Sequence, residues 1–288
     1  MPSGSILVTG GDSAYFPLMR ELIQSLQAKP ECAGVTVGVL DCGLAPAEVD
    51  WCRAVGASVV EPSFDLGFGP GLSVLPNYRA ITARPHLKRY FPGFETYLWL
   101  DADVWVQDWK AVALFLEAAH LGDVAIVPEM HRSYGNFRHQ RDDFEQANRR
   151  AYADAFGAEA AARYIRQPLV NAGVFAIRAT SPAWQVWVDV MADVALRSTN
   201  MIDQIALNVA IQDHGLGDVR LPPTCNWIAH LATPAWDEAK QAVVEPDPPF
   251  EKLGIVHLTL ATKWAGAIAL PLAGRRAAVI SRSLRYPG

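Results

Sequence analysis

Two aspartates at the end of a strongly apolar segment have the types and spacing best suited to chemistry. Asp101 and Asp103 follow residues 96–100 (TYLWL), and residues 104–106 (VWV) continue the apolar run. Buried and unpaired carboxylates are costly. A divalent cation removes that cost, because it takes several oxygen ligands and an Asp-x-Asp step supplies them from adjacent positions. The segment therefore predicts a metal site; in the alternative interpretation, one Asp caps a helix and the other is solvated.

Alternating strands and helices must position this pair. Residues 5–9, 35–40 and 58–60 have strand patterns, and helical patterns at 17–29 and 47–55 separate them. This alternation predicts an α/β fold with a doubly wound central sheet flanked by helices, which binds ligands at the carboxyl ends of its strands. Later segments continue the fold: strands at 96–100, 123–127, 173–177 and 254–260, helices at 111–119, 145–163, 183–195 and 203–212, a short or kinked helix at 79–91, and an irregular stretch at 221–252.

Composition excludes several classes of protein. The chain has 288 residues, 51% of them hydrophobic, which suits one large domain. A formal net charge of -5 argues against a surface that binds nucleic acid. No signal-peptide pattern and no apolar window of about 18 residues is present, so a membrane-spanning helix is not expected. The cysteines form no C-x-x-C pair, which favours free thiols in the cytoplasm.

The Asp-x-Asp segment resembles the D-x-D motif of glycosyltransferases with the GT-A fold. The resemblance is strongest to the retaining family 8 type, which includes bacterial galactosyl- and glucosyltransferases and glycogenin. Further segments match that family in order over nearly the whole chain: Arg84, the N-A-G strand motif at Asn171-Ala172-Gly173-Val174, the D-Q-D-x-L-N helix at Asp203-Gln204 with Leu207-Asn208, and the H-x-x-G-x-x-K-P-W ending at His257 with Lys263-Trp264. The resemblance implies one GT-A domain, with a nucleotide-binding half at 1–105, an acceptor-binding half at 106–270 and a basic tail at 271–288.

The chain departs from the family pattern at a few positions. Ile205 replaces the second Asp of D-Q-D, and Leu260 and Ala265 replace the Gly and Pro of the last motif. Asp12 stands alone where many members have two acids after the first strand. We expect nucleotide and metal binding to survive these changes, whereas the sugar and the acceptor are left unspecified.

The resemblance implies a role for each matching residue. The metal ligands are Asp101, Asp103 and His257, and the imidazole favours Mn²⁺, with Mg²⁺ as the alternative. The donor is a UDP-sugar, held by Thr9, Gly10, Asp12, Tyr15, Arg84, Ala102 and Lys263. Gln204, Asp203 and Asn171 line the sugar, and Gln204 stabilises an oxocarbenium-like state during retaining transfer of a hexose. Alternatively, Asp203 caps its helix, Gln204 is an ordinary first-turn residue, His257 is a hydrogen-bonded strand residue, and the two cations are solvated.

The acceptor is a saccharide, a lipid-linked sugar or a protein in this interpretation. Polar and aromatic groups in predicted loops that could bind it, or could equally be partial core, are Glu129, His131, Tyr134, His139, Trp227 and His230. Arg275, Arg276, Arg282 and Arg285 form a basic C-terminal segment, which would either contact anionic lipid at the inner face of the membrane or be a solvated end. The oligomeric state is not indicated.

Two other classes of protein compete with the glycosyltransferase. Phosphatases of the haloacid dehalogenase type also place D-x-D after an apolar strand, with the first Asp as nucleophile. They usually carry it near the N-terminus, whereas here it begins at Asp101. A relative that binds nucleotide sugars without transferring them is the other alternative, and Ile205 is the feature that favours it.

Overall fold

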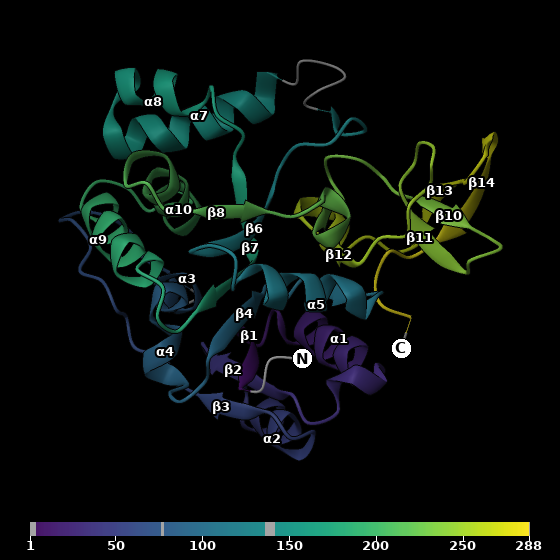
Figure 1. The fold of residues 1–288 in the computed structure, drawn as a ribbon, viewed down its shortest axis with the longest axis horizontal. Coiled ribbons are helices and arrows are strands. Elements are labelled where there is room, and N and C mark those ends of the chain that lie inside the picture. Colours follow the sequence, from purple (N-terminus) through teal and green to yellow (C-terminus); the bar gives the residue numbers. More distant parts are fainter. Residues whose placement is uncertain (1–3, 76–77, 136–141, 288) are drawn as a thin grey trace.

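A mixed sheet forms the centre of the molecule (Figure 1). The computed structural model describes residues 4–75, 78–135 and 142–287. Within these ranges the largest sheet has seven strands in the order β3-β2-β1-β4-β7-β6-β8. All of its pairings are parallel except those of β7, which runs antiparallel to β4 and to β6. The strands are β1 (Ser5–Gly11), β2 (Thr36–Asp41), β3 (Ser58–Val60), β4 (Thr96–Leu100), β6 (Val124–Pro128), β7 (Val170–Arg178) and β8 (Asp218–Arg220).

Helices cover both faces of this sheet, which explains why β1, β4 and β6 are buried along their whole length. On β1, Leu7 packs with α1 (Phe16–Gln27) and α5 (Trp109–Ala118), whereas Ile6 packs toward α9 (Ala183–Ala195) and α10 (Ile202–Asp213). The other helices are α2 (Pro46–Ala54), α3 (Tyr78–Ala83), α4 (Leu87–Tyr90), α7 (Asp142–Phe156) and α8 (Ala158–Tyr164), with short 3₁₀ turns η1 (Pro30–Cys32), η2 (Arg84–His86), η3 (Pro223–Cys225) and η4 (Leu260–Lys263). The predicted doubly wound mixed sheet is confirmed.

A small sheet joins the middle of the chain to its end. It contains β5 (Val104–Val106), β12 (Ile255–His257) and β9 (Trp227–Ile228). β12 runs antiparallel to β5, with His257 opposite Val104. This pairing brings His257 beside the residue that follows Asp103.

A four-stranded sheet lies at the edge of the molecule, on the side away from α9 in Figure 1. Its strands are β10 (Ala235–Asp237), β11 (Ala242–Val244), β13 (Ile268–Leu272) and β14 (Arg275–Arg282). The stretch predicted as irregular therefore contains short strands, and the basic segment is mostly a strand. Arg275 pairs with Glu238, Arg282 lies 3.8 Å from the ring centre of Trp236, and Arg285 pairs with Glu21. The basic segment is thus a paired strand that stays partly exposed, and neither the solvated end nor lipid contact is decided.

Two of the predicted helical segments are interrupted in the structure. The expected kink at Pro85 is confirmed, because η2 separates α3 from α4. The single helix predicted at 145–163 is instead two helices, which Gly157 divides with a φ of 85° that favours glycine. Among the described residues, the structure contains no helix of the length and apolar character that a membrane crossing needs.

Candidate functional site

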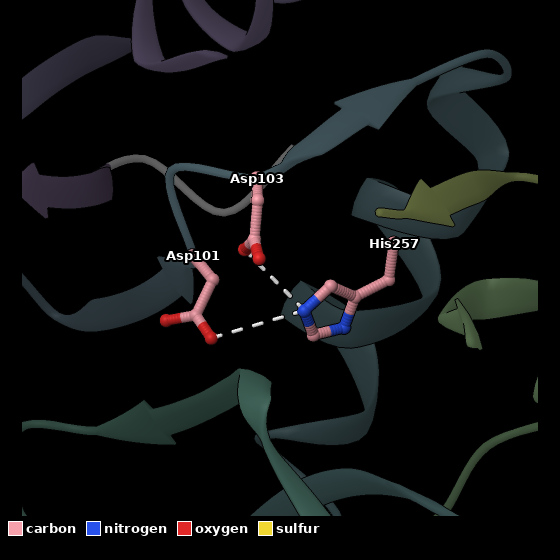
Figure 2. A group of neighbouring side chains, drawn as sticks. All are labelled: Asp101, Asp103 and His257. Carbon is pink, nitrogen blue, oxygen red and sulfur yellow. Dashed lines mark ion pairs between the residues drawn. The ribbon is translucent and has the colours of Figure 1, made fainter. Parts of the chain in front are cut away.

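The predicted metal ligands meet at the carboxyl end of β4. Asp101 and Asp103 lie in the short turn between β4 and β5, and both side chains point toward the imidazole of His257 (Figure 2). His257 Nε2 lies 3.4 Å from Asp103 Oδ1 and 3.9 Å from Asp101 Oδ2. One ligand atom from each residue lies within 4.8 Å of the other two. Two carboxylate oxygens and one imidazole nitrogen suit a divalent ion of the Mn²⁺ type.

Neighbouring groups hold the other oxygen of each aspartate. Asp101 Oδ1 accepts hydrogen bonds from Trp99 Nε1 at 2.8 Å and from the guanidinium of Arg84. Asp103 Oδ2 lies 2.8 Å from Lys263 Nζ. The remaining oxygens, Asp101 Oδ2 and Asp103 Oδ1, are thereby directed at His257, as ligands of one ion would be.

Gly173 on β7 has no side chain and so leaves space for the side chains of His257 and Asp101. A Cβ there would lie 2.4 Å from His257 Cε1, 2.8 Å from Asp101 Oδ2 and 2.9 Å from Asn171 Oδ1. These distances are shorter than Cβ contacts in real structures, so the glycine is required by the groups around it. The space and the donor set together fit a bound metal ion.

The charges of the cluster shift one another's pKa values. Burial raises the pKa of Asp101, against the opposing effect of Arg84. Burial would also raise the pKa of Asp103, but His257 and Lys263 outweigh it and lower this pKa to about 2. Burial would lower the pKa of His257, but Asp103 and Asp101 outweigh it and raise this pKa. The imidazole therefore carries a proton readily, and a metal ion would take the place of that proton.

Arg84 is a buried bridge between two acids. Its guanidinium forms ion pairs with Asp101 and Asp203 and lies 5.0 Å from the ring centre of Trp99. Met201 is the N-cap of α10 and no side chain caps it, so the interpretation of Asp203 as a helix cap is wrong. Arg84 and Lys263 are partly buried and paired, so neither is the solvated surface cation of the alternative interpretation.

A cleft of about 160 Å³ opens beside the metal ligands. It is lined by Gly10, Gly11, Asp12, Tyr15, Ala80, Ile81, Arg84, Asp101, Ala102, Asp103 and Lys263. Most of the predicted nucleotide-binding residues therefore come together, and Lys263 Nζ also bonds to Tyr15 Oη at 3.0 Å. Thr9 is outside this lining and is buried in β1. Gly10 lies within β1, one residue before the strand ends, and a Cβ on Gly10 would lie 2.7 Å from Leu40 Cβ, so packing against β2 alone already requires glycine there.

The predicted sugar-binding amides are buried beside Glu129. Gln204 Oε1 accepts from the Ala172 N–H at 3.2 Å, and Gln204 Nε2 donates to Glu129 Oε1 at 3.2 Å. Asn171 Nδ2 donates to the same carboxylate oxygen at 2.7 Å. Burial raises the pKa of Glu129, with both amides opposing the rise. Glu129 follows β6 directly, so it belongs with Gln204 and Asn171 rather than in a separate acceptor loop.

Other predicted acceptor residues have varied positions. Tyr134 and Trp227 are both 0% exposed and pack against each other with ring centres 5.1 Å apart, so the core interpretation holds for them. His131 contacts both rings and bonds to Glu245. His139 lies outside the described residues. Asn226 also contacts His257, and no sequence motif predicts it, because its only signal is a polar residue between Cys225 and Trp227.

Comparisons with known proteins identify the fold. No protein-family model matches the sequence, and no curated protein matches it. The structure is similar to galactosyltransferase LgtC in complex with donor and acceptor sugar analogues, with a TM-score of 0.53, 16% identity, and coverage of 89% of this chain and 88% of that chain. It is also similar to the bifunctional glycosyltransferase WbbM, with a TM-score of 0.57, 14% identity, and coverage of 90% of this chain and 46% of that chain.

A further similar structure is the glycosyltransferase GlyE of Streptococcus pneumoniae, with a TM-score of 0.52, 16% identity, and coverage of 90% of this chain and 55% of that chain. At such identities the similarity establishes the fold and nothing finer. The expected GT-A fold is confirmed.

Proposed function

We propose that the chain is a metal-dependent glycosyltransferase that moves a hexose from a UDP-sugar to a hydroxyl acceptor with retention of anomeric configuration. The observation that carries this proposal is the group of Asp101, Asp103 and His257, two of them buried and Asp101 partly so, beside the cleft between β1 and β4. In a GT-A fold, the carboxyl ends of the strands are where a nucleotide would bind. The similar structures support the fold, and the residues of the site support the chemistry.

The two cations of the site would bind the donor's diphosphate. When bound, Mn²⁺ or Mg²⁺ would neutralise the charge that develops on the departing diphosphate. Lys263 has three N–H donors, of which Asp103 and Tyr15 use two, so one can reach a phosphate oxygen. Arg84 holds Asp101 in place and lines the same cleft. The cleft residues come from positions 1–105 together with Lys263, which supports a nucleotide-binding half.

The buried amides would face the sugar in this proposal. In transfer, the bond from the anomeric carbon to the diphosphate oxygen breaks, the bond to the acceptor oxygen forms on the same face, and the acceptor's proton passes to the departing phosphate. Both ends of the Gln204 amide are already hydrogen-bonded, so it is held rigidly and would stabilise developing positive charge through its dipole. The Asn171 amide is also fixed in position, because its Nδ2 donates a hydrogen bond to Glu129 Oε1.

The acceptor in this proposal is a hydroxyl of a saccharide, of a lipid-linked sugar or of a protein. We place the reaction in the cytoplasm, where nucleotide sugars would meet such acceptors. A donor analogue and an acceptor screen would define these finer properties once the donor class is measured.

Thermal stability measures the donor class and the metal site together. A ligand that binds only the folded state at a hundredfold excess over its Kd stabilises by about 2.7 kcal/mol. We expect the melting temperature to rise with UDP plus Mn²⁺ and not with UDP plus chelator, GDP, ADP or dTDP. The rise should vanish in Asp103→Ala and persist in Asp108→Ala, because Asp108 is a partly exposed helix cap outside the cleft.

Turnover separates the proposal from its competitors. Release of UDP from a UDP-hexose, with a product of the donor's anomeric configuration by NMR, is the expected result. Binding of UDP without transfer or donor hydrolysis across a broad acceptor panel would instead identify a non-catalytic relative. Absence of stabilisation by any nucleotide would overturn the proposal, and phosphatase substrates would be tested next.

A further inference from the structure

A chain of buried hydrogen bonds runs behind the metal ligands. Asn226 lies between η3 and β9, is 0% exposed, and neighbours β12, which carries His257. Its Oδ1 lies 3.1 Å from His257 Nδ1, and its Nδ2 donates to Asn171 Oδ1 at 3.0 Å. Asn171 donates in turn to Glu129, which also accepts from Gln204. One continuous chain thus joins the metal ligand to the groups proposed to face the sugar.

The direction of this chain follows from its neighbours. The backbone N–H of Gly173 can only donate, and it donates to Asn171 Oδ1 at 3.0 Å. The opposite end of the Asn171 amide donates to the carboxylate of Glu129 at 2.7 Å. Asn171 is therefore oriented from both sides, and its oxygen must be the acceptor toward Asn226.

The orientation of Asn171 decides the protonation of His257. Because Asn171 offers an oxygen, Asn226 must turn its NH₂ group toward Asn171 and its own oxygen toward His257. An amide oxygen accepts only, so His257 must donate from Nδ1. With its Nδ1 proton bonded to Asn226, the neutral imidazole can offer the lone pair of Nε2, the nitrogen that points at Asp103 and Asp101, to a cation.

We propose that Asn226 is the positioning residue that selects the metal-binding tautomer of His257 and couples it, through Asn171, to Glu129 and Gln204. The tautomer is inferred from the hydrogen bonds at Nδ1, with Asp103 and Asp101 facing the other nitrogen, whereas the effect on metal binding rests on the proposed function. A polar partner that orients a metal-binding His typically contributes 10–100-fold to metal affinity or activity. Asn226 makes that contribution here although it touches neither the metal position nor the cleft.

Metal affinity tests the coupling. Mn²⁺ binding, followed by the loss of the free-ion electron paramagnetic resonance signal in the presence of UDP, should weaken about 10–100-fold in Asn226→Ala. Asn226→Asp keeps an acceptor for His257 Nδ1 but cannot donate to Asn171. It should therefore lose less than tenfold in Mn²⁺ affinity while kcat falls sharply. Asn208→Ala is the matched control, since Asn208 is also buried but bonds to the backbone of Val170 and Gln204. Its Mn²⁺ affinity should equal that of wild type.

The tautomer is measured without any metal. Long-range ¹H–¹⁵N spectra, with His257 assigned by comparison with His257→Gln and recorded above the imidazole pKa, should show the proton on Nδ1 in wild type and a mixture in Asn226→Ala. A proton on Nε2 in wild type would overturn the inference, even if Mn²⁺ binds. An Asn226→Ala variant with wild-type Mn²⁺ affinity, or equal losses in Asn226→Ala and Asn226→Asp, would also overturn it. An Nδ1 proton in a wild-type protein that binds no Mn²⁺ would refute the proposed function and the coupling, leaving only the tautomer assignment.

Discussion

A methyl group added at Gly173 should weaken metal binding by more than its effect on stability alone explains. In Gly173→Ala, the new Cβ would lie 2.4 Å from His257 Cε1 and 2.8 Å from Asp101 Oδ2. Real Cβ contacts are essentially never shorter than 3.0 Å, so the imidazole has to retreat by about 0.6 Å or β7 has to move. Metal sites hold ligand distances to within about 0.2 Å. The displacement is therefore about three times what the site tolerates, and we expect Mn²⁺ affinity to fall at least about tenfold.

The same methyl group also costs stability. Overpacking of a buried position costs about 1–3 kcal/mol, and in chains of this size about 1 kcal/mol lowers the melting temperature by about 2–4 °C. Gly122→Ala is the matched control, because its Cβ would lie 2.6 Å from Gly217 O and 2.7 Å from Val219 Cγ2, at the opposite end of β6 from Glu129. Calorimetric titration with Mn²⁺ and UDP should find wild-type affinity in Gly122→Ala despite a similar loss of stability. Equal Mn²⁺ affinity in wild type and Gly173→Ala would show that no metal binds between Asp101 and His257.

Three further changes test single contacts. Lys263→Met removes the cation at Asp103, and UDP affinity measured by calorimetry with Mn²⁺ present should fall about 10–100-fold, since a hydrogen bond to a charged group contributes about 1.5–3 kcal/mol. Unchanged affinity would place the diphosphate elsewhere. Arg84→Met leaves two buried carboxylates without their partner, and urea denaturation should find a loss of about 3–5 kcal/mol; a loss below about 1 kcal/mol would mean that water screens both acids. The pKa of His257 is raised from 6.5, so its stabilising charge is fully present below about pH 6.5 and is lost as the pH rises through the folded-state value. As the pH rises over that range, chelator-treated wild type should therefore lose stability against unfolding relative to His257→Gln. Over the same range the wild type should bind Mn²⁺ more tightly. If the stabilities of the two proteins depended on pH in the same way, the ion pair between His257 and the aspartates would be contradicted.

Local patterns were sufficient for part of the fold and of the site. Continuous apolar runs locate β1 and β4, which are buried along their whole length, and the helical spacing of apolar residues locates α1, which packs one side against the core. Asp101 and Asp103 are recognisable because acids are rare in so apolar a segment. The antiparallel direction of β7 was not predictable, because its apolar pattern suits a buried strand of either direction.

Contacts between distant segments were beyond the reach of sequence patterns. Asn226 is 31 residues from His257 and 55 from Asn171, so only the folded sheets show that it connects them. Glu129 was predicted to lie in a loop because the residues that follow it are polar. Nothing in that local pattern indicates that the side chain of Glu129 is itself buried. Leu260 stands where the glycosyltransferases that the sequence resembles have a glycine, and it still adopts a φ of 51°, with the residue 68% exposed. The turn before Lys263 therefore keeps the left-handed backbone that the glycine motif implies.

The wide separation of the site's residues along the chain affects the order in which the molecule folds during synthesis. Asp101 finds its partners Trp99 and Arg84 within its own region of sequence, but the partners of Asp103 among the described residues, His257 and Lys263, come about 150 residues later. At about 5–20 residues per second, a ribosome needs on the order of ten seconds to cover that interval. During this time the first strands can already pair, while Asp103 stays in water until β12 docks against β5. The nascent chain would thus form its sheet first, and the proposed metal site would be completed only when β12 is in place.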